Sequence, residues 1–230
     1  LVLVVIQLIW LWPGPVYSSV FQGGIRFNSY VGLAAAGMLL GEEGLSLVAV
    51  AVAVKVPLLN LLCILMFSVT CRQGRLRLAP VLRAIATNPL IIGSVVGVIW
   101  SFFRVGFHPI LAGILEPLSN LALPLGLMCV GAGLELKALR HASAPFLVSS
   151  VAKLVVFPAL TLGLALLLGM DGTMVQAAIL LAALPTATSS YILARQLGGD
   201  APLMAAIISG QTLLGMVTLP LLLGFLWQAV

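Results

Sequence analysis

The sequence predicts an all-α integral membrane protein with an inverted repeat and two broken helices that cross. Composition indicates the membrane, because 62% of the 230 residues are hydrophobic and 7% are charged, whereas a soluble domain carries about 25% charged residues. Residues 176–197 form an apolar segment long enough to span a bilayer, but Pro185 and several hydroxyl residues interrupt it. A second interrupted segment, residues 17–40, is expected to cross in the opposite direction.

The interruption at Pro185 predicts two half-helices rather than one continuous span. Proline lacks a backbone N–H and clashes with the carbonyl four residues before it. An unsatisfied backbone group inside the hydrocarbon costs several kcal/mol, so irregular backbone is tolerated only where protein surrounds it or a watery cavity borders it. We therefore expect the half-helices to meet near the membrane midplane. The hydroxyl residues at this break are Thr186, Thr188, Ser189 and Ser190.

Charged and turn residues divide the rest of the chain into apolar runs. Residues 1–12 are shorter than the roughly 20 residues that cross a bilayer, so we expect them to end a span that begins upstream. Trp-Pro-Gly-Pro at 12–15 predicts a turn. The predicted spans are about 17–40, 45–69, 88–103, 119–134, 144–169, 173–197 and 203–228, with a Gly-Glu-Glu-Gly turn at 41–44 and a short interfacial helix at 104–118.

The basic residues predict the orientation of a multi-pass protein in the cell (inner or cytoplasmic) membrane. When the turns are assigned alternately to two sides, Arg104 is the single Lys or Arg on one side. Cytoplasmic loops carry the excess of Lys and Arg. We therefore expect the loops 70–86, 135–143 and 195–202 to be cytoplasmic. The basic residues on that side are Arg72, Arg75, Arg77, Arg83, Lys137, Arg140 and Arg195.

The two interrupted segments also share a short sequence pattern. Asn28-Ser29-Tyr30-Val31 precedes Gly41-Glu42, and Ser189-Ser190-Tyr191-Ile192 precedes Gly199-Asp200. Each interrupted segment is followed by one further span. Broken spans at matching places in oppositely oriented halves are typical of the substrate sites of secondary transporters.

Both interrupted segments resemble motifs of a known family. Residues 21–30, Phe-Gln-Gly-Gly-Ile-Arg-Phe-Asn-Ser-Tyr, resemble the fourth-helix motif of prokaryotic members of the auxin efflux carrier family. Residues 183–191, Ala-Leu-Pro-Thr-Ala-Thr-Ser-Ser-Tyr, resemble the ninth-helix motif. Asn88-Pro89-Leu90 and the Leu-Pro-Leu-Gly run at 123–126 are similar to the sixth and seventh helices, so the resemblance covers essentially the whole chain.

The resemblance implies ten helices in two inverted five-helix repeats, as in the bile acid–sodium symporters. Residues 1–70 would then end the first repeat, with part of helix three, broken helix four and helix five. Residues 71–87 would form a cytoplasmic basic loop. Residues 88–230 would form the second repeat, helices six to ten with broken helix nine, and helices one and two would be missing from this chain.

The resemblance also implies a function. Members of the family are secondary-active carriers, so we expect a permease that moves small organic anions such as carboxylates by an elevator-like motion. Relatives also suggest a homodimer. Asn28 matches the crossover asparagine of the fourth helix. Plant members place a proline a few residues later, where this chain has Ala34, so details of substrate binding are not transferred on that side.

The chemistry of a carboxylate site follows from the breaks themselves. A half-helix begins with unpaired N–H groups and the positive end of a dipole, which together favour an anion. Two purely structural alternatives stay open. Pro185 is only a kink in the helix, and Asn28 only forms a hydrogen bond to a neighbouring helix. The predicted substrate-binding residues are Asn28, Ser29, Pro185, Thr186, Thr188, Ser189 and Ser190.

Three cationic residues lie inside the predicted spans. Arg26 either binds a substrate carboxylate or extends to the cytoplasmic interface. Lys55 and Lys153 lie near mid-depth, where charge is expensive and commonly functional. They either balance a carboxylate or carry a coupling proton. The coupling ion is therefore expected to be H+ or Na+.

Other functional classes find little support in the sequence. It has no paired intramembrane carboxylates, no His/Cys/Asp cluster and no phosphate-binding Gly-Lys motif, so we expect no enzyme activity, cofactor or metal. Its basic residues form no stripe for nucleic acid, and the lipid bilayer is its main surrounding. A channel-like pore or a membrane sensor on a transporter fold remain alternatives. Ser209, Gln211 and Thr212 are expected to hold helices together.

Overall fold

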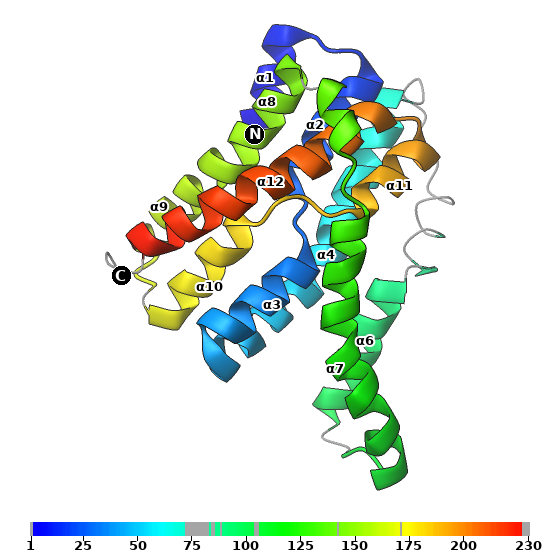
Figure 1. Ribbon diagram of the computed structural model, residues 1–230, viewed down its shortest axis with the longest axis vertical. Coiled ribbons are helices and arrows are strands. Elements are labelled where there is room, and N and C mark those ends of the chain that lie inside the picture. Colours follow the sequence, from blue (N-terminus) through cyan, green and yellow to red (C-terminus); the bar gives the residue numbers. More distant parts are fainter. Residues whose placement is uncertain are drawn as a thin grey trace.

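The computed structural model describes residues 2–71, 83, 86–87, 89–103, 106–141, 143–170 and 172–226. Every regular element in this part of the chain is helical (Figure 1), as the composition predicts. The elements are α1 (Val2–Trp10), α2 (Gly14–Ile25), α3 (Ser29–Leu39), α4 (Gly41–Cys71), α6 (Pro89–Phe102), α7 (Pro109–Ala132), the 3-10 helix η1 (Leu136–His141), α8 (Ala144–Val151), the π-helical turn η2 (Ala152–Val156), α9 (Phe157–Leu167), α10 (Gly172–Ala183), α11 (Ser189–Leu197) and α12 (Ala201–Leu226).

Four helical segments in the described chain are long and apolar enough to cross a membrane: Gly41–Cys71, Pro109–Ala132, Ala144–Leu167 and Ala201–Gly224. The third of these is continuous through α8, η2 and α9. This hydropathy, together with the all-helical architecture, confirms an integral, multi-pass membrane protein.

Both predicted interruptions are present as breaks between helices. The helix α2 ends at Ile25 and α3 begins at Ser29, while α10 ends at Ala183 and α11 begins at Ser189. The pairs α2–α3 and α10–α11 run in opposite directions, and their extended links meet near the centre of the molecule (Figure 1). The prediction of two broken, crossing helices is therefore confirmed.

The broken helices lie within a bundle that also contains α4, α8, α9 and α12. The helix α4 packs along α2, α3 and α10, and α12 packs against α2, α8 and α10. The α11–α12 turn touches the start of α2, because the Asp200 amide donates to the Pro15 carbonyl at 3.0 Å. These two turns thus lie on the same side of the molecule, as the alternating assignment of turns requires.

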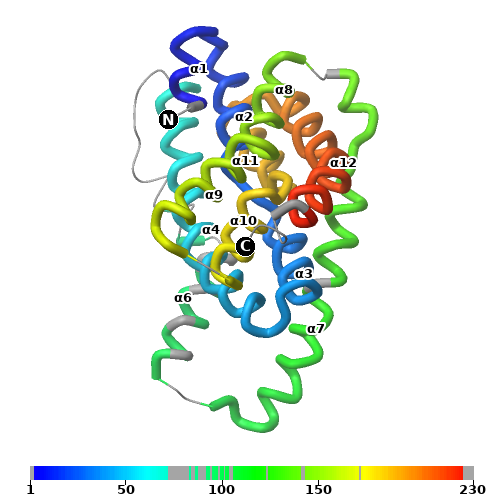
Figure 2. Tube along the Cα trace, turned by 90° about the vertical axis from the view of Figure 1, so that its left-hand side faces the viewer, coloured from blue at the N-terminus to red at the C-terminus, as the bar shows by residue number. Residues whose placement is uncertain are grey.

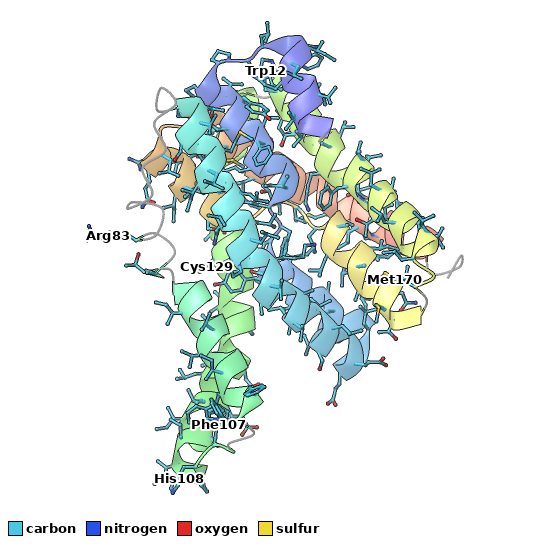
Figure 3. The ribbon with its side chains drawn as sticks, turned by 180° about the vertical axis from the view of Figure 1, so that it is seen from behind. Trp12, Arg83, Phe107, His108, Cys129 and Met170 are labelled. Atoms are coloured by element: carbon cyan, nitrogen blue, oxygen red, sulfur yellow. The ribbon has the colours of Figure 1, made fainter. Side chains whose placement is uncertain are left out.

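The helices α6 and α7 extend away from this bundle (Figure 2). They reach it through α4, which contacts α6, and through α3, which contacts α7. Phe107 and His108 lie at the far end of this pair of helices, and Trp12 lies at the opposite end of the molecule (Figure 3). Most side chains of α7 are exposed, which suits a helix surrounded by lipid or by other membrane helices.

The structure corrects two predicted boundaries. The expected interfacial helix at 104–118 and the span at 119–134 form one helix from Pro109 to Ala132, because Pro117 and Pro124 are both accommodated inside it. Transmembrane helices tolerate proline where neighbours or local adjustments satisfy the freed carbonyl. The expected turn at 41–44 is instead the first turn of α4. The chain reverses at Gly41 alone, whose positive φ of 66° suits glycine.

The predicted span 144–169 contains a π-helical turn that the sequence analysis does not anticipate. The turn, η2, comes directly before Phe157 and Pro158. Proline clashes with the carbonyl four residues earlier, and a wider turn relieves that clash. The predicted loop 71–87 lies largely outside the described residues, as do Arg104, Arg72, Arg75 and Arg77.

Gly23 allows the closest approach of α2 to its neighbours, and this generates a prediction. A Cβ there would lie 2.5 Å from Ser149 Oγ and 2.7 Å from Ile207 Cγ2, whereas a Cβ at Gly163 on α9 would meet nothing within 4 Å. We expect Gly23→Ala to destabilise the fold by about 1–3 kcal/mol through overpacking. Gly163→Ala should stabilise it by about 0.5–1 kcal/mol.

Thermal unfolding in detergent micelles measures both effects. Equal shifts of the midpoint for the two variants would contradict the close packing of α2 on α8 and α12.

Candidate substrate site at the helix crossing

The two breaks are joined through their backbones. The amide of Asn28 donates to the carbonyl of Pro185 at 2.8 Å, and both residues are buried. A helix end leaves its last carbonyls without intrahelical partners, and a buried backbone group must find one. Each break therefore supplies a partner that the other needs.

Asn28 also caps the half-helix that follows it. Its Oδ1 accepts from the amides of Tyr30 and Val31 at 3.1 and 3.4 Å, in an N-cap arrangement. Two of the donors expected to face a ligand at this helix start are thus used within the chain. The Nδ2 atom is buried and has no partner among the described residues, so it is the donor that Asn28 retains for a ligand.

The second half-helix start, at α11, keeps more of its donors. The amides of Ser190 and Tyr191 donate to the carbonyls of Ala187 and Thr188 at 3.1 and 3.2 Å. Thr188 stands at the N-cap position but makes no side-chain cap bond. Within the described residues the amides of Thr188 and Ser189 donate to no backbone carbonyl. The positive end of α11 is therefore open for an anion.

Arg26 connects the first break to the second through its side chain. Its Nη2 atom donates to Ser189 Oγ at 2.9 Å, and 8% of the residue is exposed. The guanidinium therefore stays inside the protein, which favours its interpretation as a ligand partner over extension to the interface. Beside it is a pocket of about 30 Å³, lined by Arg26, Phe27, Ser29, Val56, Leu59, Asn60, Ala187 and Ser189.

The predicted site residues divide between this pocket and the protein behind it. Ser29 and Ser189 line the pocket together with Arg26. Thr186 and Ser190 are buried behind it, and their hydroxyl oxygens have no hydrogen-bond partner among the described residues. Buried polar groups are usually paired, so these hydroxyls are further donors available to a ligand or to water.

Gln211 on α12 holds the second break in place. Its Oε1 accepts from the Thr186 amide at 3.0 Å, and its Nε2 donates to the Gly23 carbonyl and to Ser149 Oγ at 3.2 and 3.4 Å. Gln22 adds a parallel link, because its Nε2 donates to the Ser190 carbonyl at 3.0 Å. We expect Gln211 to hold helices together, and its contacts with α2, α8 and the break specify which ones.

Asn60 also lines the pocket, although its position in the sequence predicts no role for it. It is buried on α4 and lines the pocket opposite the two serines. A carboxamide in the middle of an apolar span is a polar signal. Which neighbour it faces becomes apparent only once α4 is packed against the breaks.

The two lysines of the spans both lie over aromatic rings. Lys55 Nζ is 5.1 Å from the centre of the Phe27 ring, and Lys153 Nζ is 5.0 Å from that of Phe157. Lys55 is half-buried, whereas Lys153 has no exposed surface. A cation over an aromatic face is attracted to it, so these rings stabilise part of each charge.

Two antiparallel broken helices that satisfy each other's backbone inside an apolar bundle define a membrane protein of the transporter class. The family model described as "Membrane transport protein" matches residues 75–223, more than half of the chain. The chain belongs to this family, which confirms the resemblance to the auxin efflux carriers.

Two curated relatives are also transporters by name. A protein of Rhizobium meliloti (strain 1021) named "Putative malonate transporter" is 36% identical over 140 residues, which are 59% of this chain and 43% of the relative. An "Uncharacterized transporter" of Methanothermobacter thermautotrophicus (strain Delta H) is 32% identical over 108 residues, 47% of this chain and 36% of the relative. The chain thus spans less than half the length of either. No solved structure matches it significantly.

The position of Gln211 generates a second prediction. Gln211→Leu would leave the Thr186 amide and the Gly23 carbonyl without their partners, at a cost of about 1–3 kcal/mol for each buried group. Thr212→Val is the matched control, because the Thr212 hydroxyl donates to Ile208 O within its own helix. Thermal unfolding in detergent should show a clear loss for Gln211→Leu and little change for the control. Equal midpoints would contradict the role assigned to Gln211.

Proposed function

We propose that this chain is part of a secondary-active carrier of small carboxylate anions, with the substrate bound where the two broken helices cross. The observation that carries the proposal is the bond from Arg26 to Ser189, which places a buried guanidinium at the open start of α11. Guanidinium groups bind carboxylates through two parallel hydrogen bonds. The name of the Rhizobium relative supports malonate as the first acid to test.

A carboxylate would bind by replacing the Ser189 hydroxyl as the partner of Arg26. Its second oxygen would accept from the amides of Thr188 and Ser189, and Asn28 Nδ2 would approach from the other break. The pocket of about 30 Å³ holds roughly two water molecules. The site must therefore widen to admit an organic acid, and the widening breaks the bond that now joins Arg26 to Ser189.

The arrangement of the helices supports an elevator-like motion. The helices α6 and α7 extend beyond the bundle and contact it through α4 and α3. We infer that they belong to a static part, which would also form a homodimer, while the bundle carries the substrate across the cytoplasmic membrane. The motion would be driven by the membrane potential or by a gradient of H+ or Na+.

Two other functions on the same fold make different predictions. A channel-like pore would conduct without saturating at low substrate concentration, and a sensor would bind an acid without moving it. Channel filters are commonly built from rings of symmetry-related loops, whereas here two breaks of one chain form the site. This favours a carrier.

Flux through proteoliposomes tests the proposal directly. The full-length protein is reconstituted, and uptake of malonate and other small carboxylates is measured with and without a proton gradient, in sodium and in sodium-free buffer. We expect saturable uptake of at least one acid. Asn28→Ala and Pro185→Ala should each abolish it without impairing membrane insertion, because both alter the crossing. Wild-type flux in both variants would refute a site at the crossing.

Arg26 generates a separate prediction. Arg26→Ala should raise the half-saturating concentration of the transported acid roughly 10- to 100-fold, the effect of losing a hydrogen bond to a charged group. Arg195→Ala is the control, since it removes the same side chain from an exposed position on α11. Concentration-dependent uptake measures both variants, and the same increase in the two would show that general charge, rather than the crossing, attracts the substrate.

A further inference from the structure

Lys153 is the most deeply buried cation in the described chain. Its exposed fraction is 0%, and Nζ contacts no hydrogen-bond acceptor among the described residues. It lies in η2, the π-helical turn that packs against α2 and α10. Both of those helices end at a break. Turns of this kind are found frequently at functional sites.

An ammonium in this position is costly unless something offsets its charge. The ring of Phe157 offsets part of it. The described carboxylates do not neutralise this charge, because they are exposed or half-exposed whereas the lysine is fully buried. They belong to Glu42, Glu43, Glu116, Glu135 and Asp200.

Lys55 makes the imbalance larger. It lies on α4, which packs against α2 and α10, the same two helices that η2 contacts. Its Nζ also lies over the ring of Phe27, and that ring lines the pocket beside Arg26. One side chain, Phe27, therefore lies between Lys55 and the pocket. A positive region thus adjoins the proposed site, and the described part of the chain contains no buried carboxylate.

We propose that Lys153 and Lys55 determine specificity by receiving the second carboxylate of a dicarboxylate whose first carboxylate is bound at Arg26. This rests on the proposed function. Rotation of the Phe27 ring opens the pocket toward Lys55, and the substrate's second charge offsets the positive charge of the two ammonium groups. A monocarboxylate leaves that charge without a counter-ion, so the site prefers dianions of malonate size.

The test compares malonate with monomethyl malonate, which has nearly the same shape but one carboxylate fewer. Binding to the purified full-length protein is measured by the ligand-induced rise in unfolding temperature. We expect malonate to bind about tenfold or more tightly than the monoester. Lys153→Met should bring the two affinities together by weakening malonate alone. Lys55→Met should act in the same direction, and Lys137→Met, at an exposed position, should keep the wild-type ratio.

The stability of the empty protein separates recognition from a structural role. If Lys153 serves the substrate, Lys153→Met leaves the ligand-free unfolding temperature unchanged or raises it, because a buried uncompensated charge is removed. A wild-type affinity ratio in both Lys153→Met and Lys55→Met would overturn the lysine assignment while leaving the carrier proposal intact. If neither malonate nor the monoester binds the wild-type protein and no acid is transported, both proposals fail.

Discussion

Backbone hydrogen bonding inside a hydrocarbon environment is the constraint on which this structure depends. Interrupting a spanning helix frees amides and carbonyls that lipid leaves unsatisfied. Here the Asn28 amide donates to the Pro185 carbonyl. Gln211 accepts from the Thr186 amide and donates to the Gly23 carbonyl. Because the partners of each break lie on the other break or on α12, the breaks must cross at one level. The position of Arg26 beside Ser189 follows from that crossing.

The second organising property is the distribution of charge. Carboxylates in the described chain lie at exposed or half-exposed positions, whereas Arg26 and Lys153 are buried. A buried cation without a resident counter-ion gives the crossing a positive potential, to which the start of α11 adds its dipole. An anionic substrate fits such a site. Because no carboxylate of the described residues is buried, the partner of Arg26 is a neutral hydroxyl that an incoming acid can replace.

Features with a local cause could be predicted from the sequence, whereas features that depend on distant residues could not. Pro185 with its hydroxyl neighbours marks the second break by itself, and the short pattern shared by residues 28–31 and 189–192 lies at the two helix starts. In contrast, nothing local distinguishes Gln211 from other polar residues of membrane helices. Its role depends on Gly23, 188 residues away. The uninterrupted α7 was missed because polar residues such as His108 and Glu116 suggest an interfacial segment, whereas Glu116 lies inside the long helix.

The most direct link between the two breaks, from the Asn28 amide to the Pro185 carbonyl, uses only main-chain atoms. Any residue other than proline supplies such an amide, and every residue supplies such a carbonyl. This bond therefore does not depend on which side chains surround it, whereas the links through Gln22, Gln211 and Arg26 do. Over evolutionary time, a lineage could replace the groups that touch the cargo without losing the fold, so one scaffold could acquire new cargoes through few substitutions.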